Sequence, residues 1–151
     1  MKSIKFIALL LLVALMTSCA GLGSGVKDDD VLAVIEMMNA GQTEALVESS
    51  VLPFVFDGEI LESETQINLL WSGLNKAGYV LDNPLILQQR PVMAEDASIF
   101  SETWEIKTYF KNLLTENDTY VEVQGAAGKL HMVLRPSKTG VQIAAWKGVN
   151  E

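Results

Sequence analysis

The spacing of apolar residues changes along this 151-residue chain, and that change constrains the fold more than any other feature. Over residues 31–48, and again over residues 64–77, apolar residues recur every three or four positions, as on one face of a helix. From residue 119 onward they alternate with polar residues, as in a strand with one buried face. Helices followed by strands predict an α+β domain.

Three helices are expected in the first half of the chain. Asp28 to Asp30 favour a helix start, because carboxylates there accept hydrogen bonds from free backbone N–H groups and oppose the helix dipole. Apolar residues follow at helical spacing, namely Val31, Val34, Ile35 and Met38. A short second helix is expected over residues 43–48. The third, residues 64–77, follows a capping-box sequence that begins at Ser63.

Strands are expected around and after the third helix. Residues 51–56 and 59–61 are two apolar runs separated by Asp57-Gly58, a dipeptide that favours a tight hairpin turn. Residues 85–87 predict another short strand, and residues 93–97 a loop. The chain ends in three alternating runs that predict an antiparallel meander, residues 119–124, 129–135 and 140–146.

Residues 99–111 fit two patterns at once. One strand face would hold Phe100, Trp104, Ile106 and Phe110. A helical stripe would hold Ile106, Tyr109, Phe110, Leu113 and Leu114. We expect a strand to about Thr108, followed by a helical turn to Leu114.

The first 19 residues form a distinct leader. Lys2 and Lys5 precede an apolar run over residues 7–16, and a run of about ten residues is too short to span a bilayer. Met16-Thr17-Ser18, placed directly before Cys19, resembles the lipobox of bacterial lipoprotein signal peptides.

This resemblance implies removal of residues 1–18 and attachment of acyl chains, such as palmitate, to Cys19. Several chains give a stable membrane anchor. Residues 19–27 would then form a lipidated, Gly/Ser-containing tether. Because Ala20 rather than an aspartate follows the cysteine, the resemblance favours the outer membrane. The alternative is an ordinary signal peptide that is cleaved near Ser18 or Ala20.

The remaining chain, residues 28–151, is long enough for one domain with a single core. Residues 1–18 carry two lysines and no acidic residue, so their removal lowers the formal net charge from −8 to −10. A domain with this net negative charge lacks the positive charge that nucleic-acid-binding proteins use to bind phosphates. With a single cysteine in the chain, no intramolecular disulfide can form.

The order of expected elements resembles the NTF2-like superfamily, whose SnoaL-like and cystatin-type members fold as a cone. The resemblance is carried by the helix pair 31–48, the strand and turn 53–59, the helix 64–77 and the closing strand 141–146. It implies N-terminal helices packed on a curved antiparallel sheet, with a conical pocket between the third helix and the sheet. Members range from isomerases and dehydratases to non-catalytic binding modules.

Candidate catalytic residues are few. His131 is the single histidine, so a metal cluster or a catalytic triad would have no second imidazole. An isomerase-like site would pair a carboxylate, Glu102 or Asp82, with a tyrosine, and the chain holds Tyr79, Tyr109 and Tyr120. Four acidic residues fit turn and capping chemistry better than cation binding, namely Asp57, Glu59, Glu62 and Glu64.

Aromatic residues suggest a different kind of site. Trp71, Trp104, Phe110 and Tyr79 are expected in the core or, where they line the cone, in a hydrophobic pocket with a polar handle. We therefore favour a non-catalytic module that binds an envelope protein or a small apolar ligand, without a cofactor or metal. The alternatives are a small isomerase or hydrolase and a purely structural lipoprotein. Homodimer formation is compatible with each.

Overall fold

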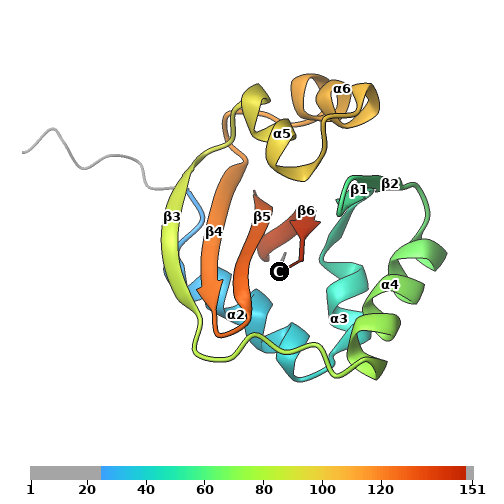
Figure 1. Ribbon diagram of the computed structural model, residues 1–151, viewed down its shortest axis with the longest axis vertical. Coiled ribbons are helices and arrows are strands. Elements are labelled where there is room, and N and C mark those ends of the chain that lie inside the picture. The colour runs from blue at the N-terminus through green and yellow to red at the C-terminus, as the bar shows by residue number, and fades with distance from the viewer. Residues whose placement is uncertain (1–24, 149–151) are drawn as a thin grey trace, which may run out of the picture.

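The computed structural model describes residues 25–148 (Figure 1). The expected signal peptide, Cys19 and most of the tether lie outside these residues, as do residues 149–151. None of the helices in the described part is both long enough and apolar enough to cross a membrane.

A six-stranded sheet forms the centre of the protein, with strand order β2-β1-β6-β5-β4-β3. The strands are β1 (Ser50–Phe56), β2 (Glu59–Leu61), β3 (Leu85–Pro91), β4 (Thr119–Gly125), β5 (Gly128–Ser137) and β6 (Gly140–Lys147). Neighbouring strands run antiparallel except β1 and β6, which are parallel. The sheet is therefore mixed, and the expectation of a purely antiparallel sheet is wrong at this pair.

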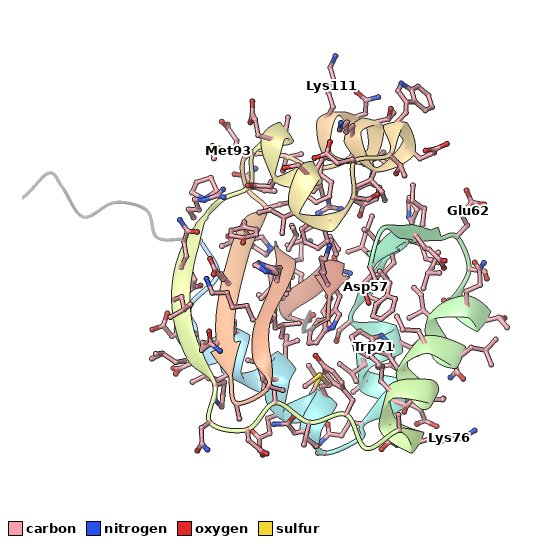
Figure 2. All side chains as sticks on the ribbon, in the orientation of Figure 1. Asp57, Glu62, Trp71, Lys76, Met93 and Lys111 are labelled. Atoms are coloured by element: carbon pink, nitrogen blue, oxygen red, sulfur yellow. The ribbon has the colours of Figure 1, made fainter. Side chains whose placement is uncertain are left out.

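Three helices precede most of the sheet, which confirms the α+β class. They are α2 (Asp28–Asn39), α3 (Thr43–Glu48) and α4 (Glu64–Lys76). The expected capping box begins α4, since the Gln66 amide donates to Ser63 Oγ and the Ser63 amide donates to Gln66 Oε1. Figure 2 shows Trp71 of α4 directed into the interior, whereas Lys76 at the end of the same helix extends into solvent.

The first hydrophobic core lies between these helices and one face of the sheet. It joins the apolar stripe of α2 to inward-facing residues of β4, β5 and β6, and Trp71 packs edge to face on Trp146 with ring centroids 5.3 Å apart. The Trp71 indole N–H donates to Ser50 Oγ at 3.1 Å, so this buried polar group is satisfied.

The second core lies on the opposite face, beneath three short helices. These are η1 (Ala94–Asp96), α5 (Ala97–Phe100) and α6 (Trp104–Asn112). The expected strand over residues 99–108 is wrong, and so is the loop over residues 93–97. The helical stripe prevails because Ile106, Tyr109 and Phe110 are all buried by docking on the sheet.

β3 lies at one edge of the sheet and is longer than the expected residues 85–87. Its polar continuation, Gln88 to Arg90, pairs with β4 through the backbone. An edge strand needs no continuous apolar pattern, because one side of it faces solvent.

Candidate functional site

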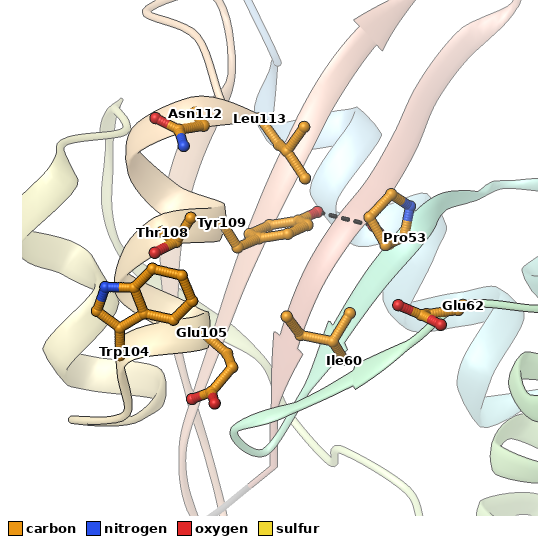
Figure 3. A pocket seen from close by; sticks show the side chains of 9 residues that line it. All are labelled: Pro53, Ile60, Glu62, Trp104, Glu105, Thr108, Tyr109, Asn112 and Leu113. Atoms are coloured by element: carbon orange, nitrogen blue, oxygen red, sulfur yellow. Dashed lines mark hydrogen bonds between the residues drawn. The ribbon is translucent and has the colours of Figure 1, made fainter.

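An open groove lies between α6 and the β1–β2 hairpin (Figure 3). We call it the α6–hairpin groove, and its volume is about 370 Å³. Its lining is mainly apolar, with polar groups at the rim, and comprises Pro53, Ile60, Glu62, Trp104, Glu105, Thr108, Tyr109, Asn112 and Leu113. A groove of this size accommodates one or two large side chains or a small ligand.

Trp104 is the most exposed large apolar residue at the groove. It is the first residue of α6, and 74% of its surface is accessible to solvent. The buried stripe of α6, Ile106, Tyr109 and Phe110, points toward the sheet and leaves Trp104 outside it. Covering the exposed part of a tryptophan contributes roughly 4 kcal/mol before the entropy cost of binding is subtracted.

Tyr109 forms the floor of the groove and fixes α6 to the sheet. Its side chain is buried, and its hydroxyl lies 3.0 Å from the Pro53 carbonyl oxygen and 2.9 Å from that of Ala144. The single hydroxyl proton is therefore shared between β1 and β6. Burial raises the pKa of Tyr109 well above its ordinary value of 10, so the hydroxyl stays protonated and keeps donating.

The rim of the groove is acidic. Glu105 projects from α6 and Glu62 follows β2, so the two carboxylates stand on opposite walls (Figure 3). The ion pairs found among residues 25–148 involve neither of them. The groove thus offers apolar contact together with two uncompensated negative charges.

The aromatic residues singled out in the sequence do not meet in one pocket. Trp71 and Phe110 belong to separate cores, and Tyr79 is half-buried against the first of them. Trp104 is the member of the set that lines the groove. This groove lies next to α6, whereas the pocket inferred from the resemblance would lie between α4 and the sheet.

The candidate catalytic residues are also separated. Glu102 is exposed just before α6 and pairs with Lys107 at 2.6 Å. Asp82 is exposed in the segment between α4 and β3, and His131 lies on β5. None of the three lines the α6–hairpin groove.

His131 belongs to a side-chain network on the sheet that the sequence did not indicate. Its Nδ1 lies 2.7 Å from the hydroxyl of Tyr120, and Glu122 is its cross-strand neighbour on β4. The Arg90 guanidinium stacks over the Tyr120 ring and forms a two-pronged ion pair with Asp96. Burial raises the pKa of Tyr120 to about 12.

This network links the sheet to η1. Tyr120 is only 2% exposed. The Arg90 and Asp96 pair anchors η1 to the edge strand, and the Met93 amide also donates to Asp96. Tyr120 and His131 lie close together because of the register between β4 and β5, and the sequence alone does not predict that register.

Two of the acidic residues around the hairpin lie in a turn and at a helix start. Asp57, in the hairpin turn, accepts a hydrogen bond from the Gly148 amide at 2.8 Å, and Glu64 occupies the first turn of α4. Within the described part of the chain, no three His, Cys, Asp or Glu side chains come together as a metal site.

No known family profile matches the sequence, and no curated protein matches it. Among solved structures, the protein is similar to the crystal structure of a DUF4783 family protein from Bacteroides ovatus, with a TM-score of 0.43 and 11% sequence identity. The match covers 78% of this chain and 94% of that chain. A similarity this low carries no inference about function.

Proposed function

We propose that this protein is a lipid-anchored, non-catalytic module of the bacterial envelope that binds a partner protein through the α6–hairpin groove. The observation that carries the proposal is Trp104, a 74% exposed tryptophan beside an open apolar groove. Tryptophan is among the residues that contribute most to protein–protein binding energy, and they do so where a rigid surface surrounds them. Tyr109 supplies that rigidity by tying α6 to two strands.

A partner protein suits this groove better than a small apolar ligand does. Small-molecule sites enclose most of the ligand surface, whereas this groove is open along one side. A protein partner brings its own surface to cover Trp104 and to exclude water around it.

The first described residues and the groove lie at opposite edges of the sheet. Gly25 and Val26, the first described residues, lie beside β3 at one edge, and β2 forms the groove wall at the other. Five strand spacings of about 4.8 Å separate those edges by roughly 24 Å. With Cys19 lipidated in the outer membrane, the groove is therefore clear of the protein's own acyl chains.

We further propose that the fold is a variant of the NTF2-like cone. The order of helix pair, hairpin, third helix and closing strands supports this, as does the contact of α2 and α4 with one face of a curved sheet (Figure 1). The parallel β1–β6 pair closes the hairpin onto the C-terminal strands.

The test is site-specific photo-cross-linking in intact cells with the full chain. A photoreactive phenylalanine at position 104 should give one discrete adduct with a partner protein. Position 69 is the matched control, since Leu69 is 68% exposed on α4 away from the groove. With the isolated partner, Trp104→Ala should weaken binding by about 30-fold or more, and Leu69→Ala by less than about twofold. Equal labelling at both positions, or none at 104, would contradict the proposal.

A further inference from the structure

The free edge of β2 indicates how a partner engages the groove, given the function proposed above. β2 pairs with β1 on one side, and residues 25–148 place no strand on its other side. Asp57 and Gly58 have φ values of 44° and 90°, as in a type I′ turn, and Phe56 lies opposite Glu59. In such a hairpin the backbone N–H and C=O of Ile60 point away from β1, toward the free edge.

An extended segment added at this edge would direct one side chain into the groove. Residues that pair across neighbouring strands point to the same face of a sheet. Ile60 lies opposite Val55, and Val55 lies opposite Ala145, so these three form one row on the face that α6 covers. The residue opposite Ile60 on an added strand would extend this row, and its side chain would lie between Ile60 and Trp104.

The acidic rim indicates which type of residue a partner should carry near the inserted side chain. Glu62 follows Ile60 by two positions, and Figure 3 shows Glu62 and Glu105 on either side of Ile60. A strand residue two positions from the inserted one points to the same face. A Lys or Arg two positions to one side would place its cation next to Glu62, and one two positions to the other side would place it next to Glu105.

We propose that the partner contributes an extended segment that joins β2 as an additional antiparallel strand. This segment inserts one apolar side chain beside Ile60 and Trp104, and two positions away it carries a Lys or Arg that pairs with Glu62 or Glu105. The strand hydrogen bonds supply affinity, whereas the groove and the rim supply specificity. A second copy of this chain fits less well, because it would bring two acidic rims together.

The experiment selects random ten-residue peptides, displayed on phage, on residues 19–151 carrying Cys19→Ser. Enriched sequences should share an apolar residue two positions from a Lys or Arg. Their affinity should fall about tenfold or more with Trp104→Ala, and about fivefold with Glu62→Gln combined with Glu105→Gln. Leu69→Ala is the matched control and should leave affinity unchanged, and thermal unfolding confirms that each variant is folded.

Backbone methylation of a selected peptide separates strand addition from simple side-chain insertion. N-methylation of the inserted residue removes an N–H that bonds to Ile60, and should weaken binding about tenfold or more. N-methylation of the next residue, whose N–H points away from β2, is the control and should change affinity by less than about threefold.

Two outcomes would overturn this inference and leave the proposed function unaffected. One is a Trp104-dependent peptide that tolerates both methylations equally, and the other is enrichment without basic residues. A selection with no Trp104-dependent peptide also overturns it, whereas the cross-linking experiment judges the proposed function separately. A concentration-dependent dimer in sedimentation that peptide dissociates would assign the edge to a second copy instead.

Discussion

Two aromatic residues of α6 have different roles, because Tyr109 stabilises the fold and Trp104 is the proposed binding residue. Tyr109 is buried, and its hydroxyl bridges carbonyl groups of two strands. Trp104, five positions earlier, is exposed and lines the groove above it. Because the buried tyrosine fixes the helix, the exposed tryptophan is presented at a defined place, which lowers the entropy cost of binding a partner.

The stability of the protein should depend on pH through His131. Its pKa lies below the ordinary value of 6.5, chiefly because burial disfavours the charged ring. Attraction to Glu122 raises this pKa, whereas repulsion from Lys129 and Lys147 lowers it. The folded protein thus binds fewer protons than the unfolded chain. This contribution to stability is fully present above pH 6.5 and is lost as the pH falls from 6.5 toward the lowered pKa.

The measurement is urea unfolding of wild type and His131→Asn at about pH 7.5 and about pH 5.5. The asparagine keeps an acceptor near the Tyr120 hydroxyl and cannot titrate. We expect the free energy of unfolding to fall more steeply on acidification in wild type. Parallel behaviour of the two proteins would show that His131 has the same pKa in the folded and unfolded states.

At the scale of elements, local patterns predicted most of the fold and failed where two patterns overlapped. Capping and periodicity located α2, α3 and α4, and alternation located β4 to β6. The prediction for residues 97–112 failed because Ile106 and Phe110 fit both a strand face and a helical stripe. Docking on the sheet, which decides between them, is a tertiary effect.

Only part of the candidate site could be predicted from the sequence. Trp104 lies outside the helical stripe that contains Ile106 and Tyr109, so the helical pattern alone would have marked it as unburied. The other groove wall depends on the parallel pairing of β1 with β6, which joins residues ninety or more positions apart in the chain. No local pattern encodes such a pairing.

The hairpin that walls the groove depends on Gly58. Its φ is +90°, and an added Cβ would lie 3.0 Å from Ser101 Cβ. We expect Gly58→Ala to lower the free energy of unfolding by about 1–2 kcal/mol. Gly73 on α4 is the matched control, because a Cβ there meets nothing within 4 Å and alanine favours the helix. Gly73→Ala should raise the free energy of unfolding by about 0.5–1 kcal/mol, and urea unfolding of both variants should give these opposite signs.

At the scale of the whole molecule, the sheet acts as a spacer between the proposed anchor and the groove. The N-terminal residues meet the sheet at β3, and the groove lies beyond β1 and β2 at the other end of the strand order. The six residue-to-residue steps from Cys19 to Gly25 span at most about 20 Å when extended. With such an anchor, the β3 edge would stay near the membrane and the groove would face the surrounding compartment.

This arrangement requires that Cys19 carry the anchor, and Cys19→Ala tests it. We expect the wild-type chain to incorporate radiolabelled palmitate in cells and to remain in the membrane fraction. The alanine variant should incorporate none and should accumulate as an uncleaved precursor, because a lipoprotein signal peptidase acts only after lipidation of the cysteine. A soluble, unlabelled wild-type protein whose N-terminus lies at residue 19 or 21 would establish the ordinary signal peptide instead. In that case the groove would act from a diffusible protein, and the edge of the sheet that bears β3 would have no fixed relation to a membrane.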